Sequence, residues 1–287
     1  AKSSLDAGSY LYVLNRIEAQ DLQHLGYGTS SSQSITLSFW VSSPKTGTHY
    51  AELYHMDSSG STKRKNSYAY TVSSANTWEK KSMTFAGNQA TGVNAINNDT
   101  GSGLMIIWYL AAGGNLQGGT NTNDNWQNTE ANRTPGQVNV ADSTSNNFYL
   151  TGVQLELGSV ATDFEYRSYG EELALCQRYC QVWAEAGDAL CVAGKGQGST
   201  AIDFLWPLAV PLRASPTVSQ TGSGWRAFRP TANLVQSSAT PTVTRFGGTH
   251  PFLGLRSSSY PSSSFTNNYV TNIGPHGLSK FIFDSEL

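Results

Sequence analysis

One segment of the chain places a single large aromatic side chain among groups that hydrogen-bond without carrying much charge. Trp126 stands in the run NTNDNWQN, where its neighbours are Asn123, Asp124, Asn125 and Gln127. Sugar rings stack their C–H faces on tryptophan, and amide and carboxylate groups hydrogen-bond to their hydroxyls. These five residues therefore form a candidate glycan-binding site with Trp126 as the stacking platform. In the alternative interpretation, Trp126 is a plug that anchors its loop to the sheet.

The residue types that serve catalysis or metal binding do not gather in this way. The five histidines are scattered, and although His49 and His55 fall on one expected strand face, no carboxylate or cysteine brackets them at ligand spacing. Asp163 and Glu165 alternate along an extended segment, but nothing in the sequence sets the separation that a glycosidase pair requires. Nucleophile-elbow, zinc-protease, P-loop and dinucleotide motifs are absent from the sequence. We therefore expect a protein that is not an enzyme and carries no cofactor.

The composition fits a β-rich protein and argues against two classes of partner. Of the 287 residues, 13% are charged and 11% aromatic, and the net charge is −2. Nucleic-acid-binding proteins normally show a basic face, whereas the single basic cluster here, at 63–65, is expected at a solvated hairpin tip. Apolar runs all fall short of the ~18 residues that span a membrane. We expect neither nucleic-acid binding nor membrane insertion.

The elements that would position the candidate site are antiparallel β-strands. Residues 34–42 give the clearest signal, because their apolar side chains alternate with polar ones. Residues 104–110 form a short continuous apolar run that is typical of a buried strand. Further strands are expected at 10–16, 48–56, 67–72 and 77–85.

Trp40, Trp78 and Trp108 are expected to pack in the core that these strands form. Residues 111–147 are rich in Gly, Asn, Thr and Gln and predict one long loop, a feature that is often functional. Regularly spaced strands with turns between them, and a single long loop, favour an all-β, antiparallel sandwich of the jelly-roll type.

The segment from Phe148 to Cys180 marks the end of this first domain. Residues 148–157 predict a strand with a bulge at Gly152, and Ser168 with Glu171 predicts a capping box that opens a short helix. In that helix Cys176 and Cys180 would lie one turn apart on an apolar face. The three cysteines of the chain show no disulfide framework.

Strand patterns return after the helix, which predicts a second, smaller β domain. Within it, residues 201–212 contain Pro207 and Pro211, so this strand is expected to be an edge strand or a broken one. The expected organisation is a jelly-roll, carbohydrate-binding-like domain at 1–167, a connecting helix at 168–180 and a C-terminal β domain at 181–287.

Several of these segments resemble a family of phage virion proteins that serve as fibre, spike or decoration subunits, including those of cyanophages. The resemblance rests on residues 29–54, 74–85, 110–113, 148–179 and 210–218, and the most specific part is FYLTGVQLELGSVATDFEYRSYGEELALCQRY at 148–179. It implies a first domain similar to the jelly roll of carbohydrate-binding modules. Such modules often hold a structural calcium, but no acidic cluster here matches that site residue by residue.

The resemblance also implies a location and partners. It predicts a virion surface protein on the tail or head, acting as a tail-fibre or receptor-binding subunit that contacts host surface polysaccharide. It predicts a homotrimer, attached to other virion proteins through an N-terminal portion that we expect to lie outside this sequence, because the chain opens inside the module. The alternative is a head fibre or capsid decoration protein with a mainly structural role, and a glycan-degrading spike is a third possibility.

Overall fold

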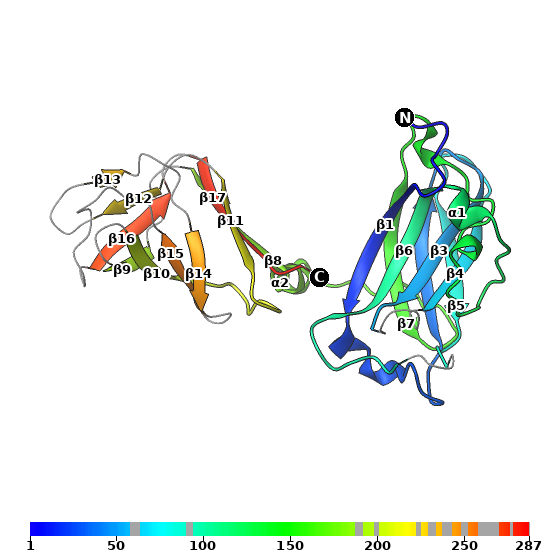
Figure 1. Cartoon of the computed structure of the whole chain (residues 1–287), viewed down its shortest axis with the longest axis horizontal. Helices are drawn as coiled ribbons and strands as arrows, with labels where there is room; N and C mark the ends of the chain where they lie inside the picture. Colours follow the sequence, from blue (N-terminus) through cyan, green and yellow to red (C-terminus); the bar gives the residue numbers. More distant parts are fainter. Residues whose placement is uncertain are drawn as a thin grey trace. The chain divides into compact units, whose positions relative to one another are not determined.

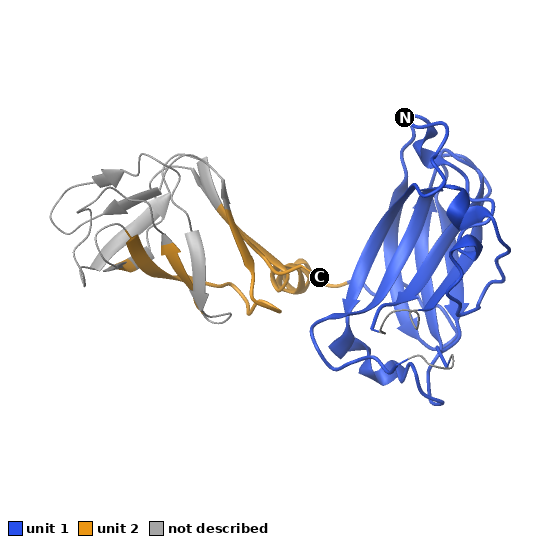
Figure 2. Ribbon diagram, viewed as in Figure 1, with its two compact units in different colours: residues 1–166, 287 blue, residues 167–286 orange. Residues whose placement is uncertain are grey.

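The chain divides into two compact units, residues 1–166 and residues 167–286, shown in blue and orange in Figure 2. The structure is a computed structural model. It describes residues 1–57, 64–89, 94–186, 192–197, 201–221, 225–228, 234–236, 243–247, 252–257, 270–275 and 278–286.

Unit 1 is a sandwich of two antiparallel sheets (Figure 1). One sheet has the strand order β1-β6-β3-β4 and the other the order β5-β2-β7. The strand pairing has the order of a jelly roll: β3 pairs with β4, β2 with β5 and β1 with β6, so that each pair encloses the previous one in the sequence. β7 pairs with the other side of β2. The strands are β1 (Tyr10–Glu18), β2 (Ile35–Ser42), β3 (Gly47–His55), β4 (Arg64–Val72), β5 (Glu79–Phe85), β6 (Ser102–Ala112) and β7 (Tyr149–Leu157).

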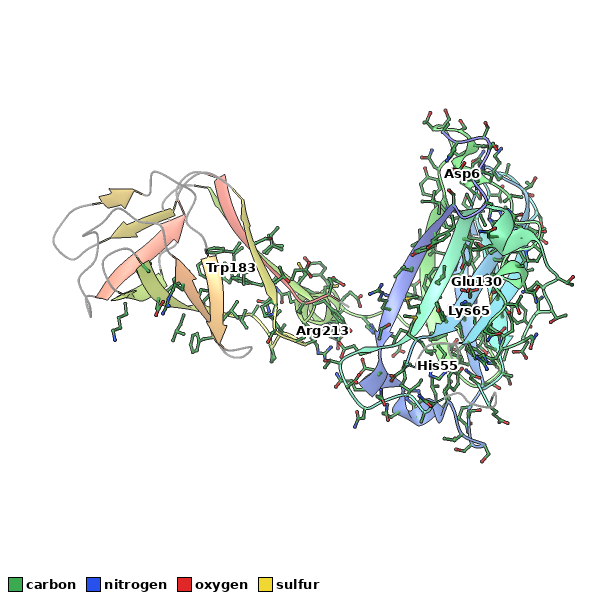
Figure 3. All side chains as sticks on the ribbon, viewed as in Figure 1. Asp6, His55, Lys65, Glu130, Trp183 and Arg213 are labelled. Carbon is green, nitrogen blue, oxygen red and sulfur yellow. The ribbon has the colours of Figure 1, made fainter. Side chains whose placement is uncertain are left out.

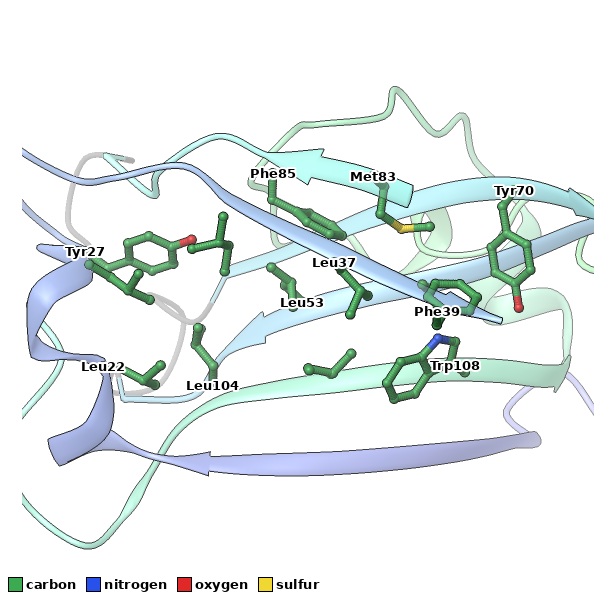
Figure 4. Close-up of a cluster of buried hydrophobic side chains, with 14 of the residues drawn as sticks. Leu22, Tyr27, Leu37, Phe39, Leu53, Tyr70, Met83, Phe85, Leu104 and Trp108 are labelled. Atoms are coloured by element: carbon green, nitrogen blue, oxygen red, sulfur yellow. The ribbon is translucent and has the colours of Figure 1, made fainter. Parts of the chain in front are cut away.

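The core of unit 1 lies between the two sheets, as the alternation in β2 predicts. Leu37 and Phe39 of β2 point toward Leu53 of β3 and Trp108 of β6 (Figure 4), and all four are at most 2% exposed. The rings of Phe39 and Trp108 meet edge to face at 5.7 Å. Burying one such side chain contributes about 1.5–3 kcal/mol to folding, so these contacts hold the sheets together.

Two tryptophans lie outside this core, contrary to the prediction. Trp40 and Trp78 are 41% and 46% exposed. Trp40 alternates with the core residues of β2, so it points to the outer face of its sheet, and Trp78 precedes the first residue of β5. The expected bulge at Gly152 is confirmed: Gly152 has φ +57°, and the register with β2 shifts there. The positive φ favours a glycine, and a Cβ there would also lie 3.2 Å from Cδ1 of Trp40, a close contact.

Strand β6 is buried on both faces, which explains its continuous apolar run. Leu104, Ile106 and Trp108 face the core, while Met105 and Ile107 belong to a second apolar cluster on the outer face of the sheet. The chain between β6 and β7 covers that outer face and contains only short helical turns, α1 (Gly114–Gln117), η3 (Glu130–Asn132) and η4 (Val140–Asp142). One further turn, η1 (Ala19–Leu25), follows β1.

Unit 2 opens with the expected helix. α2 (Tyr169–Gln177) begins at Ser168 with the predicted capping box to Glu171. The helix is shorter than expected, because Cys180 is the first residue of β8 (Cys180–Ala186) and pairs with Asp284 of β17 (Leu278–Asp284). Cys176 and Cys180 therefore do not share a helix face. No residue of α2 is buried.

The rest of unit 2 forms two further antiparallel sheets, with the orders β13-β12-β16-β9-β10-β15-β14 and β11-β17-β8. Strand β10 (Ala201–Pro207) ends at its proline as predicted, but it lies inside the larger sheet rather than at an edge. Trp206 of β10 and Phe281 of β17 pack at 5.1 Å in a core that joins both sheets. The remaining strands are β9 (Val192–Gln197), β11 (Thr217–Thr221), β12 (Trp225–Phe228), β13 (Leu234–Gln236), β14 (Val243–Gly247), β15 (Phe252–Ser257) and β16 (Val270–Pro275). Among the described residues, no helix has the length and apolar character needed to cross a membrane.

Candidate functional site

The first half of the loop between β6 and β7 lies along β4, the edge strand of its sheet. The backbone of Gln127 pairs with that of Lys65, with N···O distances of 2.8 and 2.9 Å. The Asn121 side chain donates to the Ser67 carbonyl, and Asn123 Oδ1 accepts from the backbone N–H of Ala69. An edge strand exposes a row of unpaired backbone groups, and these amide side chains satisfy part of that row.

The next loop residues are also engaged within the protein. Asp124 adopts φ +61°, which a short polar residue tolerates. Its Oδ1 accepts from the backbone N–H of Ala86 at 2.7 Å and from the Asn66 side chain at 3.2 Å. Asn125 donates to the Thr122 hydroxyl, and Gln127 Oε1 accepts from a backbone N–H two residues further on.

Trp126 occupies the position that anchors the loop. Its indole N–H donates to the Ala86 carbonyl at 2.7 Å, and its ring meets Tyr27 edge to face at 5.6 Å. The half-buried side chain packs against the main core of unit 1. These contacts favour the plug, the alternative that the sequence left open. Asn123, Asp124, Asn125 and Gln127 are close to Trp126, but each uses one polar group of its side chain in a bond that fixes the loop.

The start of the loop and its second half cross the outer face of the β1-β6-β3-β4 sheet. Leu116 is buried in the apolar cluster on that face, and the Tyr50 hydroxyl donates to the Pro135 carbonyl at 2.9 Å. Gln137 donates to the Tyr109 carbonyl of β6. This cover leaves part of the face open beside β1.

At this opening lies a pocket whose walls are mainly tyrosines. It has a volume of about 110 Å³ and is lined by Tyr10, Tyr12, Tyr54, Met105, Ile107, Tyr109, Leu116 and Arg133. Tyr10 and Tyr12 stack at 5.4 Å with an interplanar angle of 12°, and Tyr12 meets Tyr109 edge to face at 6.2 Å. The pocket is small compared with the 300–1,000 Å³ of typical drug-sized sites, so it suits one ring rather than an extended chain.

A network of four charged side chains borders the pocket. Arg133 makes a bidentate pair with the fully buried Glu52, at 2.6 and 3.0 Å, and a third bond to Glu130 at 2.7 Å. Lys65 also bonds to Glu130, and Figure 3 shows these two side chains together. The Lys65 side chain is 6% exposed, so the expectation of a solvated basic turn was wrong for this residue.

Two tyrosines complete the network. Arg133 lies 5.7 Å from the Tyr54 ring centre and 5.6 Å from that of Tyr109, while Lys65 Nζ lies 5.1 Å from the Tyr54 ring. Such cation–π contacts are favourable, and they fix the faces of the aromatic rings. The Tyr109 hydroxyl donates to Glu52.

The ionisation of this network follows from burial and from its opposite charges. Burial alone would lower the pKa of Arg133, but the charge and hydrogen bonds of Glu52 raise that pKa above its ordinary value. Burial alone would raise the pKa of Glu130, but Lys65 and Arg133 lower it. Burial raises the pKa of Tyr54, and burial with Glu52 raises that of Tyr109. Arg133 and Glu130 are therefore charged at neutral pH, beside neutral phenols.

This arrangement suits the recognition of a ring with apolar faces and hydroxyl edges. The tyrosine rings offer surfaces for stacking, and their hydroxyls both donate and accept hydrogen bonds. Arg133 has five N–H groups and uses three of them in the bonds to Glu52 and Glu130. The pocket thus combines apolar walls with a few fixed polar groups, as binding sites commonly do.

Some residues of this pocket could have been found from the sequence, although the search for site motifs did not point to them. Tyr10 and Tyr12 alternate at the start of β1, which places them on one face. Tyr50, Glu52 and Tyr54 share the outer face of β3, where a carboxylate between two aromatics requires a cationic partner once it is buried. Arg133 is the single arginine of the otherwise charge-poor residues 111–147.

The two histidines of β3 serve the core rather than a metal site. His49 and His55 are both fully buried on the core side of the strand. Asn88 donates to His55 Nδ1, and His49 Nε2 lies 2.9 Å from the Lys45 carbonyl. The described part of the chain contains no group of three or more His, Cys, Asp or Glu side chains that could hold a metal ion, so no calcium position is assigned.

No protein-family model and no curated protein matches this chain.

Proposed function

We propose that this protein is a non-enzymatic virion surface protein of a phage, a tail-fibre or receptor-binding subunit that contacts host surface glycans. The observation that carries the binding role is the pocket formed by Tyr10, Tyr12, Tyr54, Tyr109 and Arg133. Its aromatic walls match the faces of a sugar ring, and its position on a rigid sandwich matches the requirement for a preformed site. The virion setting rests on the sequence resemblance.

The proposal moves the sugar contact from the loop around Trp126 to the outer face of the sheet. Tyr10 is 53% exposed, whereas Trp126 is half-buried with its N–H engaged. An accessible ring can stack on a ligand without first losing internal contacts. The loop contributes Arg133 and Leu116 to the pocket instead.

A substitution of one pocket tyrosine tests the proposal. On a glycan array, the wild-type chain is expected to bind, and Tyr12→Ala is expected to weaken that binding at least tenfold, since stacking on the ring is lost. Tyr149→Ala is the control, because Tyr149 is an exposed tyrosine too, at 53% against 36% for Tyr12, but belongs to the other sheet. Absence of any bound glycan, or equal binding by the Tyr12→Ala variant, would contradict the proposed role.

The second candidate function, a head fibre or capsid decoration protein, is favoured by a different surface. The outer face of the β5-β2-β7 sheet exposes Trp40, Trp78 and Tyr149, and Trp78 contacts Tyr149 at 6.2 Å. Exposed aromatic groups of this kind are typical of protein–protein interfaces. Labelled antibody against this chain, imaged on intact particles, separates the two: label at the tail tip supports the first function, and label over the head supports the second.

A further inference from the structure

The charged side chains beside the tyrosine pocket indicate which kind of sugar the pocket would accept. This inference rests on the proposed function. Glu52 and Glu130 carry two negative charges, and Arg133 and Lys65 carry two positive ones. The network is therefore neutral as a whole. Among the described residues that line the pocket, Arg133 is the one with a charged side chain.

Both cations of this network already pair with carboxylates of the protein, so neither is available to pair with an anionic ligand. Arg133 holds Glu52 through Nε and Nη2 and Glu130 through Nη1. Lys65 is buried against Glu130. A sugar carboxylate or sulfate would have to displace one of these carboxylates, and breaking a buried pair leaves an uncompensated charge. The remaining N–H groups of Arg133 can still donate to an uncharged hydroxyl.

In addition, the carboxylate of Glu130 would repel an anionic ligand. Its side chain is 53% exposed, while those of Glu52, Arg133 and Lys65 are at most 12% exposed. The most accessible charge of the network is thus negative, and it lies next to the guanidinium that lines the pocket. This carboxylate would repel an acidic sugar in the pocket from beside it, and salt screens that repulsion over about 10 Å at 0.1 M ionic strength.

We propose that the pocket selects uncharged sugar rings over carboxylated or sulfated ones, and that Glu130 is the residue that sets this preference. Rejection by an unfavourable charge is a common source of specificity, because it acts against the wrong ligand without strengthening contacts to the right one. Glu130 acts from beside the pocket, through charge, rather than by contact with the ring.

The test uses an array that carries neutral hexose oligosaccharides and, for each, the hexuronate counterpart that differs only at C6. The wild-type chain is expected to bind a neutral member at least tenfold more tightly than its uronate partner at 50 mM salt, with a smaller ratio at 500 mM. Glu130→Gln is expected to raise uronate affinity at least threefold relative to the neutral affinity of the same variant. Glu172→Gln, the same change of charge on α2, is expected to alter neither.

The outcomes separate the two proposals. Uronates that bind as tightly as their neutral partners would overturn the selectivity while leaving glycan binding intact. A neutral-to-uronate ratio that is unchanged in Glu130→Gln would overturn the role of Glu130. Failure of every sugar to bind the wild-type chain would overturn the proposed glycan function and the selectivity with it.

Discussion

Trp126 connects parts of unit 1 that are distant in sequence. It joins the loop after β6 to Ala86, which follows β5, and to Tyr27, which follows η1. The hydrogen bond orients the indole, and the edge-to-face contact places its apolar surface against the core. Trp126 therefore helps to fix the loop that carries Arg133 to the pocket.

Replacement of this anchor is expected to destabilise unit 1. Trp126→Ala removes a half-buried ring and its hydrogen bond, so we expect a loss of about 2 kcal/mol and a Tm lower by about 5 °C in a thermal melt followed by circular dichroism. Trp78→Ala is the control, because that ring is largely exposed, and its Tm is expected to stay within about 1 °C. Equal melting of Trp126→Ala and wild type would show that the ring is no anchor.

His55 makes the stability of unit 1 depend on pH. Burial lowers its pKa from the ordinary 6.5 to about 4, and the Asn88 amide that donates to Nδ1 also disfavours a proton there. Burial likewise lowers the pKa of His49, an effect that its bond to the Lys45 carbonyl partly offsets. The unfolded chain therefore binds protons more readily than the folded one between pH 6.5 and 4.

The contribution of neutral His55 to the free energy of unfolding is therefore expected to be fully present above about pH 6.5. It is expected to be lost as the pH decreases toward 4, with a total loss of up to about 3 kcal/mol. Urea unfolding at pH 7.5 and 4.5 measures this loss. His55→Gln is expected to be less stable at pH 7.5 but to lose less on acidification, whereas the same change at the exposed His24 is expected to have no such effect. An unchanged pH dependence in His55→Gln would contradict this assignment.

At the scale of elements, the chain between β6 and β7 replaces regular structure with side-chain bonds. Its asparagines pair with the free edge of β4, and its arginine pairs with Glu52 in the middle of β3. The sheet thereby gains a cover on its outer face without another strand. The cover needs specific partners because a buried carboxylate without a cation is costly.

The Arg133–Glu52 pair is expected to be strongly coupled. Arg133→Met leaves a fully buried carboxylate without its cation, and we expect a loss of about 3 kcal/mol in urea unfolding. The double variant Glu52→Gln/Arg133→Met is expected to lose about 2 kcal/mol less free energy of unfolding than the two single variants lose together. Arg167→Met provides the control, because Arg167 and Glu172 are both more than half exposed at 3.4 Å and such pairs contribute little. Additive effects at Arg133 and Glu52 would argue against the pair.

At the scale of the whole molecule, α2 is a helix whose side chains stay uncovered by the residues that the structure describes. It has nine residues, none buried, and exposes Leu173 and Leu175 by 40% and 46%. A helix this short is not stable by itself in water and depends on packing. We propose that copies of the chain associate as a homotrimer in which α2 packs near the three-fold axis, the number three being taken from the resemblance.

Light scattering at micromolar concentration tests this association. The wild-type chain is expected to have three times the mass of one chain, and Leu173→Glu with Leu175→Glu is expected to reduce it to one, because charges would enter the apolar contact. Val160→Glu, at a position 71% exposed outside the helix, is expected to leave the trimer intact. A wild-type mass of one chain would count against the trimer.

The amino-acid sequence by itself determined the features that depend on local chemistry. The alternation at 34–42, the apolar run at 104–110, the glycine bulge in β7 and the capping box at Ser168 each follow from side chains a few residues apart. Those short-range preferences were enough for the all-β class, the sandwich and the position of the helix.

Only the tertiary structure decided which faces are covered and which charges meet. Glu52 and Arg133 are 81 residues apart, and β10 lies inside its sheet because β9 and β15 pair with both of its sides. Trp40 is 41% exposed, although residues 158–165 bond to Thr36, Gln154 and Glu156 on the same sheet face. The equivalent face of the other sheet carries the chain between β6 and β7. The alternation of a strand predicts that its sheet has two faces. The path of loops that are distant in sequence determines which outer face is covered to form a second apolar cluster and where a pocket remains.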